Sequence, residues 1–387
     1  MKVLFTLAAV AALIAGPALA ETGVTDSEIR IGEISALSGP VASVGEAYTI
    51  GTRLAVEEIN ANGGINGRKV VLFVEDDGAQ PGRTFPAAKK LIEQDQVFAF
   101  NGTSGSANVL AILPLLEEGN IPAIVSWAPN NLVYEDRVRP SVFVMGASYT
   151  ETFDAALKYI HESAEPGDAV YGVIRQDDAF GETIEAAYDN AIENYGVKDG
   201  LRLKFKRGQT DFGAEALQLK QAGVDVVING TIVSGTASLF KSMRQAGLEV
   251  VSTNVYTELM PASINLQKPG GYTYYVGDYV AGVAEPAGQA VIEKARKYLT
   301  DAEAEKINRY TFASYASMLI FAEAAGQCGA DLTRDCYIEK LRGLDGFDTG
   351  GLTAPITFSK EEQRAGQASK VYKVDAATGE VTPVTGF

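Results

Sequence analysis

The run GTSGS at residues 102–106 is the part of the sequence that comes closest to catalytic chemistry. It resembles the nucleophile elbow G-x-S-x-G, which holds a serine on a sharp turn between a strand and a helix, but Ser106 stands where the second glycine is required. A nucleophilic serine also needs a base, and the only histidine, His161, falls inside a predicted helix. Phosphate-binding, dinucleotide-binding and zinc-protease motifs are missing from the sequence as well. We therefore expect a protein that is not an enzyme, and a periplasmic hydrolase that uses the ligand cleft is the alternative.

Two groups of residues have side chains that can bind a metal ion. Three carboxylates at 75–77 close a predicted strand and can hold a divalent cation, but neighbouring strand side chains point to opposite faces, which favours a solvated strand end. Cys328 and Cys336 are the only cysteines, and their short spacing favours a structural disulfide in an exported protein. A metal site with two cysteines is the alternative, although zinc usually takes four ligands. We expect neither a metal nor a cofactor.

Small polar loops follow three predicted strands, at 38–45, 101–106 and 126–130. The carboxyl ends of parallel strands form the edge at which open α/β sheets bind ligands. The loop with Ser104 and Ser106 also opens a predicted helix, and a helix N-terminus favours a carboxylate. An ordinary helix cap is the alternative for both serines.

Three larger side chains are candidates for the walls of such a site. Trp127, the only tryptophan, lies in one of the polar loops, where it lines a cleft or else plugs a core. Phe180 opens a predicted helix in the second half of the chain and is placed to cover a ligand from the other side. Glu258 follows a later strand and is a candidate partner for an ammonium group, with ordinary surface charge as the alternative.

Short β-branched runs alternate with amphipathic segments of helical length, which predicts parallel sheets covered by helices. The expected strands are 29–35, 70–74, 97–100, 121–125, 142–144, 169–174, 201–206, 224–228, 250–253, 272–276, 353–358 and a closing hairpin of 371–374 with 381–384. The expected helices are 48–62, 83–94, 107–118, 151–163, 180–195, 212–221, 235–246, 287–299, 310–325 and 334–341.

This pattern predicts an α/β protein with two doubly wound lobes that hold a ligand in the cleft between them. We expect residues 21–145 with 276–354 in the first lobe and residues 146–275 with 355–387 in the second. The lobes would be joined by a hinge through which the chain crosses more than once, near Met145, Tyr275 and Ala354.

The beginning of the chain and its charge indicate where the protein works. Residues 1–20 combine Lys2, a short apolar run and an A-x-A ending, which predicts a signal peptide cleaved after Ala20 and export to the periplasm. A transmembrane anchor is the alternative, but the apolar run is shorter than the roughly 20 residues that a span needs. The net charge of −16 and the lack of a Lys/Arg block exclude nucleic acid as an expected partner and speak against direct membrane insertion.

The segment from Ile31 to Asp77, with VEEINANGGING at 56–67, resembles the periplasmic branched-chain amino acid binding proteins, the type I solute-binding components of ABC transporters. The resemblance covers nearly the whole chain after residue 20. It implies that a ligand carboxylate is held by Ser106 and by the loop of Ser126, Trp127 and Ala128. It also implies that Phe180 covers the ligand and that Glu258 pairs with an α-ammonium group, while Val44 stands where the family can place a tryptophan.

The resemblance implies a periplasmic protein that captures a small carboxylate by hinge closure and delivers it to the permease and ATPase complex of an ABC importer. An amino acid, branched-chain or similar, is the expected solute if Glu258 faces the cleft, because a buried ammonium needs an anionic partner. Aromatic carboxylates and urea-like amides, which similar proteins carry, are the alternatives.

Overall fold

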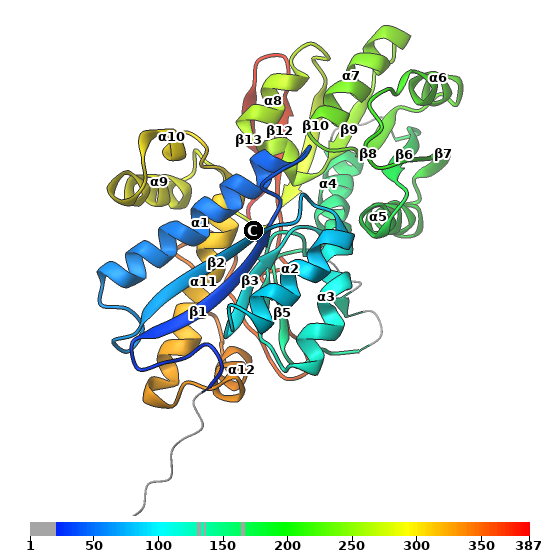
Figure 1. Cartoon of the computed structure of the whole chain (residues 1–387). Helices are drawn as coiled ribbons and strands as arrows, with labels where there is room; N and C mark the ends of the chain where they lie inside the picture. The colour runs from blue at the N-terminus through cyan, green and yellow to red at the C-terminus, as the bar shows by residue number, and fades with distance from the viewer. Residues whose placement is uncertain (1–20, 130–132, 135–136, 164–166) are drawn as a thin grey trace, which may run out of the picture.

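The computed structural model describes residues 21–129, 133–134, 137–163 and 167–387. The predicted signal peptide, residues 1–20, lies outside these ranges. The described strands form two sheets, each covered by helices, and the second sheet with its helices lies above the first in Figure 1. We call each sheet with its helices a lobe. The predicted α/β class with two doubly wound lobes is confirmed.

The sheet of the first lobe has the strand order β11-β5-β4-β3-β1-β2, and all of its pairings are parallel. Its elements in the first part of the chain are β1 (Glu28–Ser35), α1 (Ala42–Ala61), β2 (Lys69–Asp76), α2 (Pro81–Glu93), β3 (Ala99–Thr103), α3 (Ser106–Glu118), β4 (Ala123–Val125) and β5 (Val142–Met145). Parallel pairing brings the carboxyl ends of β1, β3 and β4 to one edge, so the three predicted polar loops lie near one another.

The sheet of the second lobe has the order β13-β12-β10-β9-β8-β6-β7. Its elements are α4 (Tyr149–Ser163), β6 (Val170–Gln176), α5 (Ala179–Tyr195), β7 (Lys198–Phe205), α6 (Gly213–Gln221), β8 (Val226–Gly230), α7 (Ser234–Ala246), β9 (Val251–Asn254), the 3-10 turn η2 (Tyr256–Leu259), α8 (Pro261–Gln267) and β10 (Thr273–Asp278). The predicted closing hairpin is present as β12 (Lys370–Asp375) and β13 (Glu380–Pro383), which pair antiparallel.

The late helices return to the first lobe, where α11 packs along α1 and against β3. They are α9 (Pro286–Tyr298), α10 (Asp301–Ala304), α11 (Arg309–Gln327), the 3-10 turn η3 (Gly329–Asp331) and α12 (Arg334–Arg342). Gly51 makes the close approach of α1 and α11 possible, because a Cβ at this position would lie 2.1 Å from the Thr311 carbonyl oxygen.

Sheet membership corrects several predicted boundaries. All of β10 pairs within the second sheet, so the second crossing follows Asp278 rather than Tyr275. The short β11 (Arg364–Ala365) pairs with β5, so the third crossing follows Ala365 and not Ala354. No strand forms at 353–358 as predicted. In this stretch Ile356 makes only an isolated antiparallel bridge with Phe347.

Helix α1 begins at Ala42, earlier than the serine and glycine residues of that stretch suggested. Val44 and Ala47 are buried in its first turns, and this packing outweighs the weak helix propensity of the stretch. No helix in the described part of the chain is long and apolar enough to cross a membrane.

Candidate functional site

Ser106 is the first residue of α3 and lies at the carboxyl edge of the first sheet. Gly105 before it has φ +111°, a conformation that suits glycine, and this turn sets Ser106 at the start of the helix. Ser106 is only 4% exposed, and its Oγ has no hydrogen-bond partner in the structure. A buried hydroxyl without a partner costs free energy, so this atom is suited to bind something that the chain itself does not supply.

Ser104 is placed differently, because its Oγ donates to the buried carboxylate of Asp77. The same carboxylate accepts hydrogen bonds from the backbone N–H of Ala79 (2.8 Å), from Thr84 Oγ1 (2.8 Å) and from Asn108 Nδ2 (2.9 Å). Asp77 therefore orders the loop after β3 and the first turn of α3 through hydrogen bonds. Among the described residues, Asp77 belongs to no group of three or more His, Cys, Asp or Glu side chains that could hold a metal ion.

The loop after β4 forms an aromatic wall. The Trp127 ring packs between Tyr48 and Tyr310, with centroid distances of 5.3 Å and 5.8 Å. Ser126 Oγ is 2.6 Å from Tyr48 Oη, so its hydroxyl is already engaged. Ala128 is fully buried and does not line the cavity described below. Of the described residues of this loop, 126–129, only Trp127 lines the cavity.

The second lobe contributes Phe180 to the lining of the same cavity. Asp178 caps α5 by accepting from the N–H groups of Phe180 (3.1 Å) and Gly181 (3.3 Å), which fixes the first turn of the helix. The other oxygen of Asp178 accepts from Arg207 Nη2 at 2.6 Å. Phe180 packs edge-on against Tyr149 at 4.9 Å, so the second lobe also presents an aromatic surface.

These groups enclose a cavity of ≈ 70 Å³ between the lobes. Its lining consists of Val41, Val44, Ala79, Ser104, Gly105, Ser106, Asn108, Trp127 and Tyr310 from the first lobe and Tyr149, Gln176, Phe180, Arg207, Ile232 and Thr257 from the second. A wider opening of ≈ 440 Å³ shares Ala79, Gln176 and Arg207 with it, and we take this opening as the mouth of the cavity.

Glu258 lies outside the lining of this cavity and is fully buried in the second lobe. Its carboxylate accepts from the backbone N–H of Val233 (2.7 Å) and from the side chains of Ser263 and Gln267. Burial raises the pKa of Glu258 to about 7. Glu258, the candidate partner for an ammonium group, does not line this cavity in the structure, because donors of the second lobe surround its carboxylate, whereas its neighbour Thr257 does line it.

An ion pair joins the lobes beside the cavity. Arg309 at the start of α11 donates from Nε and Nη2 to the two carboxylate oxygens of Asp278 at the end of β10, both at 2.7 Å, and both side chains are almost fully buried. Thr257 Oγ1 lies 2.8 Å from Tyr310 Oη, and Tyr256 Oη donates to the Trp127 carbonyl oxygen at 3.2 Å. These contacts between lobes describe a closed arrangement.

A larger cavity of ≈ 470 Å³ lies among α8, the loop before α9 and the closing hairpin. The acids in its lining are already paired, Asp278 with Arg309 and Glu285 with Lys370 and Tyr372. The smaller cavity is the better candidate, because it lies at the carboxyl ends of β3 and β4 and contains an unpartnered hydroxyl.

The sequence did not indicate Asn108, Tyr149, Gln176, Arg207 or Tyr310 as cavity residues. Asn108 follows Ser106 on the same helical turn, which was an available signal. Tyr310 and Tyr149 come from helices of different parts of the chain and are brought to the cavity only by the crossings between the lobes.

The hydrolase alternative requires a base beside a serine. Among the described residues Ser106 Oγ has no partner, and Ser104 donates to a carboxylate that is saturated by other donors. His161 does not line the cavity and its ring stacks on Tyr195 at 5.8 Å. Nothing in this geometry favours hydrolysis.

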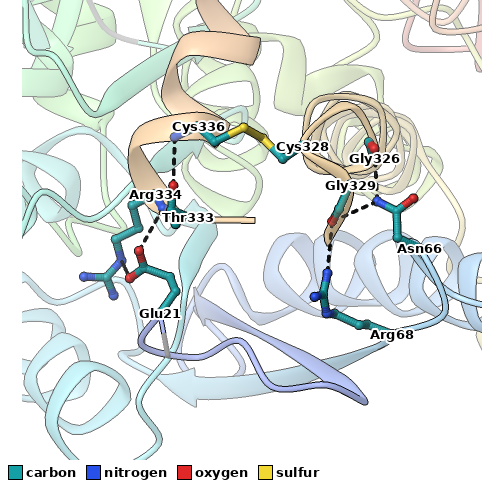
Figure 2. The surroundings of a disulfide bond; sticks show 9 residues. All are labelled: Glu21, Asn66, Arg68, Gly326, Cys328, Gly329, Thr333, Arg334 and Cys336. Carbon is teal, nitrogen blue, oxygen red and sulfur yellow. Dashed lines mark hydrogen bonds and ion pairs between the residues drawn. A yellow bond between two sulfur atoms is a disulfide. The ribbon is translucent and has the colours of Figure 1, made fainter. Parts of the chain in front are cut away.

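The two cysteines form a disulfide at α12, a helix that lies at the lower end of the first lobe in Figure 1. Figure 2 shows the Cys328–Cys336 disulfide linking the end of α11 to α12, with Thr333 capping α12 through the Cys336 N–H. Nearby, Arg68 and Asn66 donate to backbone carbonyls at the end of α11, and these bonds hold this end against the loop before β2. The predicted disulfide is confirmed, and it is structural.

Comparison with known proteins identifies relatives over most of the chain. A family model described as "Periplasmic binding protein" matches residues 28–380. An amino acid binding protein of Pseudomonas aeruginosa is 30% identical over 312 residues, which cover 79% of this chain and 80% of that protein.

Solved structures share the fold at lower identity. A fatty acid ABC transporter substrate-binding protein from Thermomonospora curvata superposes with a TM-score of 0.81 at 22% identity, covering 94% of this chain and 93% of that one. A branched-chain amino acid ABC transporter protein from Thermus thermophilus with bound valine also gives 0.81, at 19% identity, covering 94% and 96%.

Proposed function

Because the chain belongs to the periplasmic binding proteins of the branched-chain amino acid binding type, we propose that it captures a small carboxylate between its lobes and delivers it to the permease and ATPase complex of an ABC importer. Members of this family bind solutes and are not enzymes. The proposal places the work of this chain in the periplasm, where the family acts.

One observation carries the carboxylate proposal: Ser106 Oγ is buried and unpartnered at the N-terminus of α3, in a cavity that both lobes enclose. The first N–H groups of a helix have no partner within the helix and carry a partial positive charge. A carboxylate at this place would accept from both the hydroxyl and the helix N-terminus. Trp127 and Phe180 then form facing walls that enclose the rest of the solute.

Capture would proceed by hinge closure. The first lobe holds the carboxylate, and the second lobe adds Phe180 and Tyr149 only when the lobes come together. Contacts made only in the closed form shift the population toward it, and the closed form is what a transporter would recognise. The expectation of an amino acid solute depended on Glu258 as the partner of its ammonium group. Because Glu258 does not line the cavity, the chemical group that accompanies the carboxylate has to be argued from other residues.

A thermal-shift screen with amino acids, carboxylic acids and urea-like amides tests this function. A ligand at one hundred times its Kd stabilises the native state by about 2.7 kcal/mol and raises the Tm by several degrees. Small-angle scattering should show compaction with the same ligand. If no carboxylate changes either quantity, the proposal is wrong, and turnover of esters that Ser106→Ala abolishes would identify a hydrolase instead.

A further inference from the structure

We infer that the solute is an aromatic carboxylate without an ammonium group; this inference rests on the proposed function of the same cavity. The first reason is the charge of the lining. Arg207 is its only charged residue among the described residues, and none of those lining the cavity or its mouth is an acid. A buried ammonium that lacks an anionic partner is costly, whereas a carboxylate finds donors there.

The acids nearest to the cavity are already saturated. Asp77 accepts from four donors of the first lobe. Asp178 accepts from two backbone N–H groups and from the side chains of Gln176 and Arg207. An incoming ammonium would have to displace one of these donors, so neither acid is available to pair with it.

Glu258 is not available either. Its carboxylate is saturated by donors of the second lobe and does not reach the cavity. Glu258 was the candidate to pair with the ammonium group of an amino acid. Its carboxylate instead stabilises the junction of α7 and α8.

The second reason is the aromatic lining. Trp127 and Tyr310 approach from the first lobe, and Tyr149 and Phe180 approach from the second. Aromatic rings pack against one another face to edge or offset, with a gain beyond the burial of area alone. Four rings around one small cavity therefore favour a planar aromatic body.

Aromatic rings can also attract a cation, but the Arg309 guanidinium already lies against two tyrosine rings at this site. The Arg309 guanidinium lies 4.1 Å from the ring centre of Tyr256 and 4.5 Å from that of Tyr310. Tyr310 also lines the cavity, and Tyr256 stacks on Tyr149 at 5.0 Å. Arg309 therefore already occupies the faces of Tyr256 and Tyr310, which leaves these two rings less able to attract a second cation.

Ligand pairs that differ only in the α-ammonium group test the inference directly. We would compare 3-phenylpropanoate with L-phenylalanine, phenylacetate with L-phenylglycine, and 4-methylpentanoate with L-leucine. Trp127 is the only tryptophan and lines the cavity, so its fluorescence reports binding there. We expect the acid to bind at least about tenfold more tightly than the amino acid in each aromatic pair, a difference of about 1.4 kcal/mol.

The aromatic part is tested with 3-cyclohexylpropanoate, which has a ring of similar size without π electrons. It should bind more weakly than 3-phenylpropanoate. Equal affinity of the two compounds would overturn the claim that the solute is aromatic. Tighter binding of the amino acids, or of glycine betaine, would overturn the whole inference but leave the proposed function standing. If no member of any pair binds while another carboxylate does, the inference fails and the proposed function stands; if no carboxylate binds at all, the proposed function itself fails.

A variant pair tests the electrostatic reason. Thr257→Asp adds a carboxylate to the cavity wall, and Thr257→Asn adds the same shape without the charge. We expect the preference for the acid to shrink or reverse only in the Asp variant. Equal preferences in the two variants would contradict the explanation, and the ligand pairs on the unaltered protein decide the inference even if the Asp variant does not fold.

Discussion

Asp77 in the first lobe and Glu258 in the second are both fully buried carboxylates surrounded by donors, yet they serve different ends. The donors of Asp77 include Ser104 and Asn108, which line the cavity, whereas Ser263 and Gln267, which donate to Glu258, do not. The first lobe uses its acid to shape the binding loop, while the second lobe uses its acid to hold its own helices. The difference teaches that a buried acid near a cleft is not by itself a ligand partner.

The largest expected effect concerns the pair that joins the two lobes. Arg309→Met leaves the Asp278 carboxylate buried without its partner, so we expect the free energy of unfolding to fall by about 3–5 kcal/mol. Denaturant titration measures this. The double variant Arg309→Met with Asp278→Leu should recover much of the loss, and Arg296→Met on the exposed face of α9 should have little effect. If Arg309→Met is as stable as the unaltered protein, the ion pair does not hold the lobes.

The pH dependence of unfolding tests the role of Glu258. Burial raises the pKa of Glu258 to about 7, so the folded state binds its proton more tightly than the unfolded state does. This contribution is complete below about pH 4.5 and is lost as the pH rises to about 7, a change of about 3 kcal/mol.

Glu258→Gln should remove this part of the pH dependence of unfolding, measured by denaturant titration between pH 4.5 and 7. Glu33, whose pKa burial also raises to about 7, contributes a separate slope that the variant should retain. Ligand affinity should be unchanged in Glu258→Gln. Loss of affinity for amino acids alone would restore Glu258 as the ammonium partner.

Two buried serines sharpen the comparison further. Ser106→Ala removes a hydroxyl that has no partner in the protein, so stability should change little, while carboxylate affinity should fall by about 1.4–2.8 kcal/mol, roughly 10–100-fold. Ser263→Ala removes a donor to Glu258, so stability should fall and affinity should persist. Titration calorimetry and thermal melts on both variants check this, and the opposite pattern would contradict the assignment of the cavity.

The smallest effect is expected at Asp77 itself. Asp77→Asn replaces one acceptor oxygen by a donor in a cluster of donors, which should cost about 1–3 kcal/mol of stability. Affinity should fall as well, because Ser104 and Asn108 lose their anchor. Asp168→Asn at an exposed turn is the matched control. Unchanged affinity in Asp77→Asn would mean that the loop keeps its shape without this carboxylate.

The sequence predicted most of the long elements, because periodicity depends on local residue types. It placed Ser106, Trp127 and Phe180 at the ends of strands or starts of helices, and the structure brings these three, with Val44 and Ser104, to one cavity. It could not show that Ser104 and Ser126 already have partners within the protein, since Asp77 and Tyr48 lie far from them in the chain.

The sequence by itself determined the α/β class, the closing hairpin and the disulfide, because each of these depends on residues that are close together in the chain. Only the tertiary structure decided which side chains face the cavity. Glu258 turned inward because donors from α7 and α8 gather around it, and Tyr149, Arg207 and Tyr310 reached the cavity because the chain crosses between the lobes. The orientation of a buried polar side chain is set by the donors around it, and residues distant in the sequence supply many of those donors.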